Sequence, residues 1–324
     1  MTGSLPAPHK LPGLPDSVEI YEVGPRDGLQ NESTTVPLET KVEFIQRLVV
    51  AGLLVVEATS FVSAKWVPQL GDADTLFPLL APQPGVRFPV LVPNLNGLDR
   101  AVRAGAREIA VFASATESFA KRNLNRTVDE ALAMFAPVVE AARANDMWVR
   151  GYVSMCFGDP WEGVVPQAQV VKVCERLMEM GCAQLSIGDT IGVATPGQVL
   201  ELLTALGSAG IPTRHLAVHF HDTYGQALSN TLAALEAGVT TVDSSAGGLG
   251  GCPYARSATG NLATEDLVWM LDGLGIRTGV DLDLLAATSR WLSDELGRPS
   301  PSRVVRALAT SEQTEEGGTV GTVS

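Results

Sequence analysis

The chain has 324 residues, of which 45% are hydrophobic and 18% are charged, and its net charge is −13 at neutral pH. This composition is ordinary for a globular enzyme, and the acidic balance argues against nucleic-acid binding because the phosphate backbone would be repelled. No apolar run reaches the roughly 18–20 residues needed to span a bilayer, so we expect no membrane partner.

The first residues predict a short arm rather than a targeting segment. Residues 1–16 have no apolar core like that of a secretory signal and no arginine-rich amphipathic pattern. Four cysteines are scattered through the second half without a CxxC pair, which favours a reduced compartment: Cys156, Cys174, Cys182 and Cys252. We therefore expect a flexible arm over 1–16, a cytoplasmic protein and a packing role for the first three cysteines.

Short apolar runs then alternate with longer amphipathic ones. Eight runs have the pattern of strands: 17–25, 53–61, 86–94, 108–115, 148–156, 183–190, 215–222 and 240–248. Several helical stretches between them end in a glycine, which supplies the left-handed conformation that stops a helix: Gly52, Gly105, Gly181, Gly210 and Gly238. Eight such units favour an α/β fold closed into a (β/α)8 TIM barrel, with an open doubly wound sheet as the alternative.

The end of the chain predicts an addition to the barrel. A helical pattern covers 281–296, beyond the eighth unit. We expect a single barrel domain with this C-terminal helical extension over 17–308. The segment 309–324 is polar and rich in small residues, which predicts a disordered tail.

Two of the four histidines stand two residues apart at the end of the seventh predicted strand. Alternate residues of a strand share a face, so His219 and His221 point the same way. Asp27, after the first strand, could add a carboxylate oxygen, and three such ligands leave open positions on a metal. The alternative is that the histidines only form hydrogen bonds in a polar loop. We predict a metal site, although these residue types alone fit iron or zinc as well as magnesium.

Further polar residues fall where a TIM barrel places its chemistry, at the carboxyl ends of strands. Arg26, in the turn GPRDG, suits an oxyanion or carboxylate, or else forms only a surface ion pair with its neighbour. Glu57 and Asp189 each interrupt an apolar strand and either support catalysis or pair with an arginine. Cys252 lies in the glycine-dense loop 247–261 and could transfer a proton, or be a small packed hydrophobe.

Five stretches, in this order, show that the chain resembles the 3-hydroxy-3-methylglutaryl-CoA lyase family: EVGPRDGLQNE, EATSFVSAKWVPQLGD, LSIGDTIGVATPG, AVHFHDTYGQALSNTLAAL and VDSSAGGLGGCPYARSATGNLATEDLVWML. The resemblance runs from about Val18 to about Leu308. It implies a metal-dependent barrel that cleaves 3-hydroxy-3-methylglutaryl-CoA (HMG-CoA) to acetyl-CoA and acetoacetate by a retro-Claisen reaction, as in leucine degradation.

The resemblance also implies the site. One Mg²⁺ or Mn²⁺ per subunit would be held by Asp27, His219, His221 and Asn261. The essential arginine of the family falls on Arg26, its loop cysteine on Cys252, and its catalytic acids on Glu57 and Asp189. The base that takes the proton of the substrate hydroxyl would be Asp27, with Asp189 or Glu57 assisting. Either Cys252 or His219 would protonate the enolate carbon, and a homodimer is the usual assembly of similar proteins.

The acyl-CoA substrate raises two further points. Lys121 and Arg122 could contact the CoA phosphates, or belong to a solvated charged loop. The stretch GDPWEG (158–163) departs from the family pattern, which has a cysteine and a tyrosine flanking the proline. A lyase for a longer 3-hydroxy-3-alkylglutaryl-CoA, such as the isohexenyl compound, is therefore an alternative. An acyl-CoA condensing synthase and a non-catalytic metal-binding protein are more remote ones.

Overall fold

A computed structural model describes residues 6–30, 32, 34–250 and 260–316, with 310–316 described by their backbone only. Its main sheet is entirely parallel and contains β1 (Glu19–Glu22), β2 (Val55–Val56), β3 (Thr59–Ser60), β4 (Val90–Leu91), β5 (Glu108–Ser114), β6 (Trp148–Ser154), β9 (Gln184–Asp189), β10 (Leu216–Phe220) and β11 (Thr241–Ser244). Each of the eight predicted runs contains one of these strands, and the second run contains both β2 and β3. A short antiparallel hairpin, β7 (Gly158–Asp159) with β8 (Gly163–Val164), follows β6.

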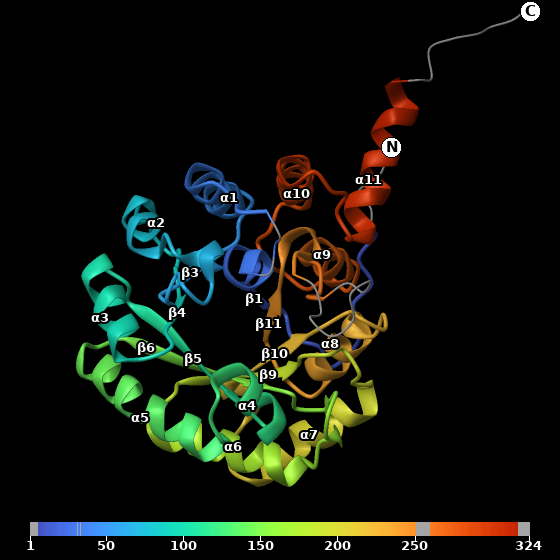
Figure 1. Cartoon of the computed structure of the whole chain (residues 1–324). Coiled ribbons are helices and arrows are strands. Elements are labelled where there is room, and N and C mark those ends of the chain that lie inside the picture. Colours follow the sequence, from blue (N-terminus) through green and yellow to red (C-terminus); the bar gives the residue numbers. More distant parts are fainter. Residues whose placement is uncertain (1–5, 31, 33, 251–259, 317–324) are drawn as a thin grey trace, which may run out of the picture.

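The sheet closes on itself through residues 55–60. The strand order is β2-β1-β11-β10-β9-β6-β5-β4-β3, and its two edge strands are parts of this one extended segment. On one side the Glu57 amide donates to the Glu22 carbonyl at 2.8 Å, and on the other the Ala58 amide donates to the Pro89 carbonyl at 3.0 Å. The predicted TIM barrel is therefore confirmed (Figure 1).

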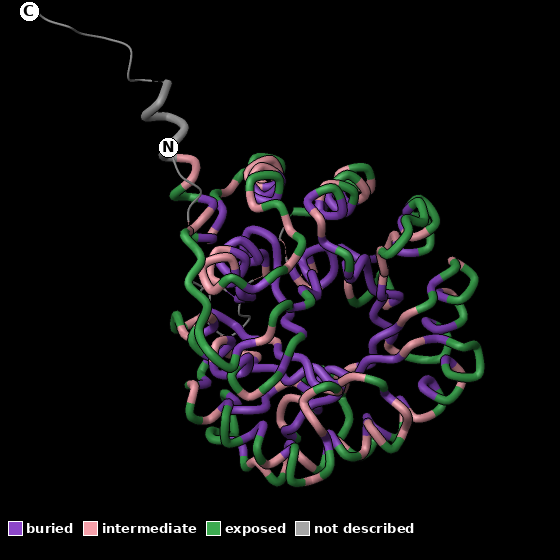
Figure 2. Tube along the Cα trace, turned by 180° about the vertical axis from the view of Figure 1, so that it is seen from behind, coloured by how far each residue is buried: buried purple, intermediate pink, exposed green. Residues whose placement is uncertain are grey.

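Helices form a ring around the sheet (Figures 1 and 2). They are α1 (Leu38–Val50), α2 (Ala73–Leu79), α3 (Leu95–Ala104), α4 (Glu117–Leu124), α5 (Val128–Ala144), α6 (Gln167–Met180), α7 (Pro196–Ser208), α8 (Ala227–Glu236), α9 (Thr264–Gly273), α10 (Leu282–Leu296) and α11 (Arg303–Glu316). The five glycines predicted to stop helices all have φ between 84° and 104°, the left-handed region. The helix predicted over 281–296 is confirmed as α10.

The alternation of side chains along each strand produces two buried layers. Val149 and Val153 of β6 belong to the large apolar core between the sheet and the helices. Tyr152, between them, belongs to a smaller group of buried residues on the other face, and Arg150 is fully buried next to it. The outer layer therefore supplies the bulk of the apolar packing, whereas the barrel interior combines a small apolar cluster with charged side chains such as Arg150.

The described residues of the arm and of α11 contact the helices of the barrel. In the arm, the His9 amide donates to the Gly273 carbonyl at 2.7 Å and Leu14 is buried. The expected disorder from residue 309 is wrong for 309–316, because α11 continues to Glu316. Three of the eight residues in 309–316 are glutamates, which favour a helix. Asp266 fixes the helix start by accepting from the Ser302 hydroxyl and the Val304 amide. Residues 317–324 lie outside the described part. Within the described ranges, no helix has both the length and the apolar character needed to cross a bilayer.

Candidate metal centre and its surroundings

Three of the four predicted metal ligands meet at the carboxyl ends of strands. Asp27 lies in η1 (Gly24–Gly28), the turn after β1, while His219 is in β10 and His221 directly follows it. One ligand atom from each lies within 4.8 Å of the others. The two imidazole Nε2 atoms are 3.3 Å apart, as expected for side chains that share a strand face.

The η1 turn depends on glycines because the chain passes very close to its neighbours. A Cβ at Gly24 would lie 2.5 Å from a carboxylate oxygen of Glu22. A Cβ at Gly28 would lie 2.8 Å from the side chains of Ser245 and Leu249. Only glycine allows this approach, which brings the turn to the centre of the barrel mouth.

Within the turn, Arg26 is buried between two carboxylates. Its Nε donates to Glu57 Oε2 at 2.7 Å and its Nη1 donates to Asp27 Oδ1 at 2.6 Å. Glu57 Oε2 also accepts from the hydroxyl of Tyr152 at 3.0 Å. The structure thus joins the two acids and the arginine that were predicted separately, and adds Tyr152 to them.

The same arrangement sets the charge of the two acids. Burial opposes ionisation of Asp27, but Arg26, His219 and the hydrogen bond from Asn261 outweigh it and lower the pKa of Asp27 to about 2. For Glu57 burial dominates, and its pKa is raised although Arg26 opposes the shift. Asp27 is therefore an anion at neutral pH, which suits a metal ligand.

His221 offers a neutral imidazole. Burial, followed by the neighbouring His219, lowers the pKa of His221 to about 4. Two Nε2 atoms at 3.3 Å can share one proton or one cation between them, but they cannot both carry a proton. One carboxylate oxygen and two imidazole nitrogens therefore make a donor set that fits a divalent cation, and their residue types do not select which one.

The fourth predicted ligand lies beside this set. Asn261 is buried and pairs with His221 in an isolated β-bridge. Its amide nitrogen donates to Asp27 Oδ2 at 2.8 Å and to the Leu249 carbonyl at 3.0 Å. Metal binding through its amide oxygen remains a prediction.

Asp189 ends β9 and is also buried. Its carboxylate accepts from the backbone amides of Val193 and Ala194 at 3.0 and 2.9 Å. Burial nevertheless raises its pKa to about 6, with the amide hydrogen bonds opposing the shift. Cys252, the predicted proton donor, lies outside the described residues.

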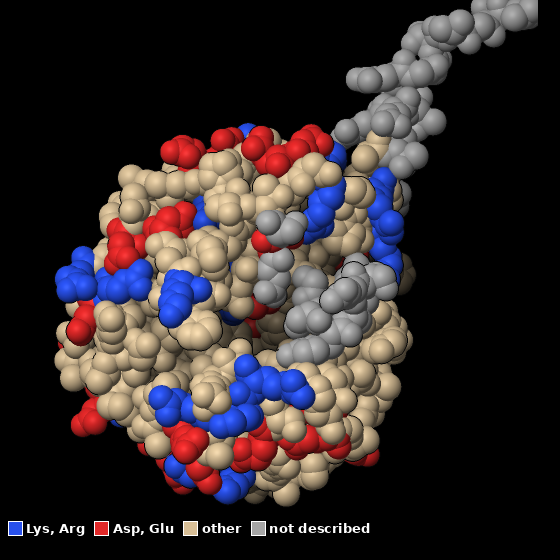
Figure 3. Space-filling model, in the orientation of Figure 1, with Lys and Arg blue, Asp and Glu red and all other residues tan. Residues whose placement is uncertain are grey.

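The predicted CoA contacts lie apart from the ligand cluster. Lys121 and Arg122 are exposed in the last turn of α4, and basic side chains gather over this helix at the edge of a central hollow (Figure 3). The guanidinium of Arg122 stacks on the ring of Trp161 at 4.1 Å. The stretch GDPWEG, which departs from the family pattern, therefore contacts α4 through Trp161.

Sequence reasoning missed a second group of charged residues beneath the histidines. Arg150 Nη2 donates to Asp243 Oδ1 at 2.6 Å, and both side chains are fully buried. Asp243 Oδ2 lies 3.2 Å from Nδ1 of His219 and accepts from the hydroxyl of Ser186 at 2.8 Å. The only signal in the sequence is a single charged residue in each of two predicted strands, Arg150 and Asp243.

It also missed two buried acids under the glycine-rich segment 246–248. Glu22 accepts from the amides of Gly24 and Ala246, both at 2.8 Å, and from the Thr264 hydroxyl. Glu265 accepts from the Gly247 amide at 2.8 Å and from the Ser289 hydroxyl. Burial raises the pKa of Glu22 to about 7 and that of Glu265 to about 8.

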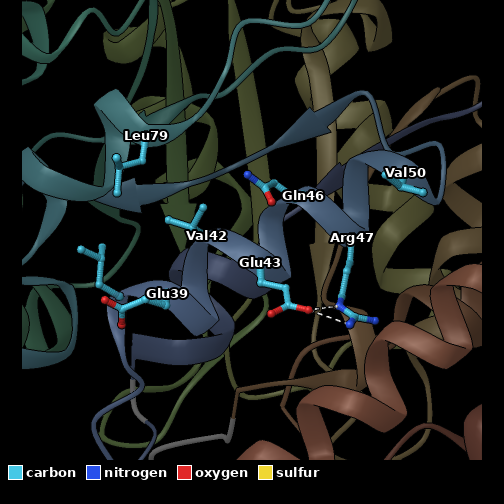
Figure 4. A pocket seen from close by; sticks show the side chains of 8 residues that line it. Glu39, Val42, Glu43, Gln46, Arg47, Val50 and Leu79 are labelled. Atoms are coloured by element: carbon cyan, nitrogen blue, oxygen red, sulfur yellow. Dashed lines mark hydrogen bonds and ion pairs between the residues drawn. The ribbon is translucent and has the colours of Figure 1, made fainter.

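A separate hollow of about 650 Å³ lies on the outside of the helix ring (Figure 4). Its walls come from α1 and α2, and Glu43 and Arg47 form an ion pair along it. It contains none of the residues predicted to carry chemistry. The three described cysteines, Cys156, Cys174 and Cys182, are free and buried, as expected for packing roles.

Comparison with known proteins agrees with this geometry. Residues 17–292 match the family model described as HMGL-like, which spans the whole barrel. The chain belongs to the HMGL-like family. The matched residues include all four predicted metal ligands, from Asp27 near the start of the match to Asn261 near its end.

Curated relatives of this HMGL-like chain carry lyase names. Over 296 residues it is 55% identical to "Hydroxymethylglutaryl-CoA lyase, mitochondrial" of Arabidopsis thaliana, covering 91% of this chain but only 63% of that protein. It is 50% identical over 298 residues to "3-hydroxy-3-methylglutaryl-CoA lyase, cytoplasmic" of Mus musculus, covering 92% of this chain and 87% of that protein. The relatives thus include both mitochondrial and cytoplasmic forms.

Solved structures give the same result. The hydroxymethylglutaryl-CoA lyase of Pseudomonas aeruginosa superposes with a TM-score of 0.90 at 46% identity, covering 92% of this chain and 99% of that one. An HMG-CoA lyase of Acinetobacter baumannii, solved with coenzyme A and 3-methylmalate, gives a TM-score of 0.85 at 38% identity, covering 90% and 95%.

Proposed function

We propose that this chain cleaves 3-hydroxy-3-methylglutaryl-CoA to acetyl-CoA and acetoacetate with the help of one bound Mg²⁺ or Mn²⁺. The observation that carries the proposal is the meeting of Asp27, His219 and His221 beside the buried Arg26. The names of the relatives support the reaction, and the bacterial structure that contains coenzyme A supports a CoA-linked substrate.

The cleavage needs a base, an anion-stabilising group and a proton donor. The substrate's 3-hydroxyl loses its proton, the C2–C3 bond breaks, and acetoacetate leaves together with the enolate of acetyl-CoA. The enolate carbon then takes up one proton. When bound, the cation supplies Lewis acidity that lowers the pKa of the substrate hydroxyl.

The pKa values favour Asp189 as the base, with Glu57 as the alternative. Asp27, with a pKa of about 2 and a guanidinium on one oxygen, is a poor proton acceptor at neutral pH. Asp189, with a pKa of about 6, is ionised near neutral pH and still binds a proton readily. We therefore assign metal binding to Asp27 and proton abstraction to Asp189.

Arg26 stabilises the negative charge that develops on the thioester oxygen. Its guanidinium is held in place by Glu57 and Asp27, so it needs little reorganisation during the reaction. One such preorganised donor is worth about 3–4 kcal/mol. Cys252, with His219 as the alternative, returns the proton to the enolate carbon.

The CoA portion extends to the rim in this proposal. Lys121 and Arg122 contact its phosphates, and Trp161 shapes the entrance beside them. A homodimer and a cytoplasmic location stay predictions, which light scattering and fractionation of the source cells respectively would check.

The deciding experiment is a cleavage assay on 3-hydroxy-3-methylglutaryl-CoA with the purified full chain. We expect turnover with Mg²⁺ or Mn²⁺, loss of turnover in EDTA, and recovery when excess metal is added. Undiminished turnover in EDTA would contradict the metal role. Faster cleavage of a longer 3-alkyl homologue, or condensation without cleavage, would instead support the corresponding alternative.

A further inference from the structure

The charged group beneath the histidines has a geometry that the cleavage reaction does not by itself require. Arg150 and Asp243 lie in β6 and β11, with 0% of either side chain exposed. Burying such a pair costs several kcal/mol per ion, and replacing it with apolar residues is often neutral or stabilising. Stability alone is therefore a weak reason for its presence.

Its contacts lead directly to the candidate metal centre. Asp243 and His219 are opposite each other in the register between β11 and β10. Asp243 Oδ2 lies 3.2 Å from His219 Nδ1, and on the far side of the same ring Nε2 lies 3.3 Å from His221 Nε2. The His219 ring thus connects the buried pair to the ligand cluster.

We propose that Arg150 and Asp243 are positioning residues that hold His219 in the tautomer whose Nε2 lone pair faces the metal. The proposal rests on the proposed metal-dependent function. A carboxylate paired with a guanidinium has only acceptor oxygens, so the His219 Nδ1 beside it must donate. In a neutral imidazole the proton then sits on Nδ1, which leaves Nε2 unprotonated and able to bind a cation.

The surroundings make this orientation rigid. The Arg150 guanidinium stacks on the ring of Tyr21 at 3.8 Å and lies 5.0 Å from that of Tyr152, so it has little room to move. The Ser186 hydroxyl donates to the same Asp243 oxygen that faces His219. The carboxylate is therefore held from two sides while it accepts from the ring.

The first test needs no substitution. In metal-free protein labelled with ¹⁵N-histidine, long-range ¹H–¹⁵N spectra report which ring nitrogen carries the proton. The His219 signals are assigned by their loss in the His219→Gln variant. We expect the proton on Nδ1 of His219, and a proton on Nε2 would overturn the proposal.

The second test measures the affinity for Mn²⁺ alone, by calorimetry or electron paramagnetic resonance, without substrate. Asp243→Asn preserves the size of the side chain but offers an amide that can donate to Nδ1 and so favour the wrong tautomer. We expect Mn²⁺ to bind about 10–100-fold more weakly, the usual effect of removing such a partner. A dissociation constant within about threefold of wild type, in a folded variant, would overturn the proposal.

One control separates positioning from general loosening. Asp72→Asn breaks the ion pair with the buried Lys41 between helices. It should keep Mn²⁺ affinity near wild type, and a loss equal to that of Asp243→Asn would count against the proposal. If the wild type bound no Mn²⁺, the proposed function would lose its metal, whereas the spectra would still decide the tautomer.

Discussion

Two regions of this barrel hold carboxylates in different charge states, one part-buried with 26% of the Asp27 side chain exposed and one with Glu22 and Glu265 fully buried. At the candidate metal centre, Asp27 faces the guanidinium of Arg26 and has a pKa of about 2. Under the segment 246–248, Glu22 and Glu265 contact only amides and hydroxyls, and their pKa values are about 7 and about 8. Burial raises the pKa in both regions; at the part-exposed Asp27 the neighbouring Arg26 and His219 outweigh it, whereas at the fully buried Glu57 Arg26 does not.

The difference separates two uses of a buried acid. An ionised carboxylate beside the neutral imidazole of His221 attracts a divalent cation. A carboxyl group that still holds its proton near neutral pH adds no charge, yet its oxygens continue to accept from backbone amides and its proton can be donated. Glu22 and Glu265 therefore fix the base of the glycine-rich segment, and Glu265 does so largely without adding negative charge near the ligand cluster.

The largest expected effect comes from removing the guanidinium of Arg26, which lies beside the acids of the candidate metal centre. Arg26→Gln keeps the polar character of the side chain but leaves Asp27 and Glu57 without a positive partner. It also removes the group assigned to the thioester oxygen. We expect the turnover number to fall about 10²–10³-fold, as for loss of one preorganised donor, in steady-state assays with saturating metal.

Arg100→Gln is the matched control for this variant. Arg100 also pairs with a carboxylate, Asp74, at 2.5 Å and stacks on a ring, that of Phe61, at 5.5 Å, but it lies outside the cluster. Its loss should leave turnover nearly unchanged. Wild-type turnover in Arg26→Gln would remove this residue from the mechanism.

A medium effect is expected on stability in the second region. The pKa of Glu265 is about 8 in the folded chain against an ordinary 4.5, so the unfolded chain releases this proton first as the pH rises. The stabilisation is complete below pH 4.5 and is lost as the pH rises through about 8. Within that window the contribution declines by at most about 1.4 kcal/mol per pH unit for one proton.

Glu265→Gln tests this sign because glutamine resembles the protonated acid. In urea titrations with EDTA, the free energy of unfolding of the variant, relative to wild type, should rise between pH 5 and pH 8. The control is Glu43→Gln, whose side chain is half exposed and paired with Arg47 on the surface. A difference that stays flat across this range would contradict the assignment of a protonated Glu265.

The sequence predicts the strands and helices of both regions better than it predicts the side-chain contacts within them. Apolar runs and helix-stopping glycines place all eight strands, because burial and backbone geometry are local properties of the chain. The HxH pattern places His219 and His221 on one face for the same reason. The tail was misjudged from its polar composition, which does not exclude a helix that contains several glutamates.

The supporting contacts could not be predicted in this way. Asp243 bonds Arg150 across 93 positions of sequence, and Glu22 bonds Thr264 across 242. A single charged residue within a strand gives no sign of whether its partner is an arginine, an amide or water. Only the closure of the barrel brings these groups together. Their contacts then set the pKa of each acid.

The smallest expected effect lies at the rim, where exposed cations should contribute to substrate affinity and nothing else. Arg122 is exposed and stacked on Trp161, and an exposed ion pair is worth at most about 1 kcal/mol. Arg122→Ala should therefore raise KM about two- to fivefold at low salt with kcat unchanged. The difference from wild type should shrink as salt screens the CoA phosphates.

Arg107→Ala is the control, since Arg107 is an exposed cation directly before β5, at the opposite end of the barrel strands. An equal rise in KM for both variants would point to a general effect of net charge, whereas a fall in kcat for Arg122→Ala would place the rim cation closer to the chemistry than the proposed site allows.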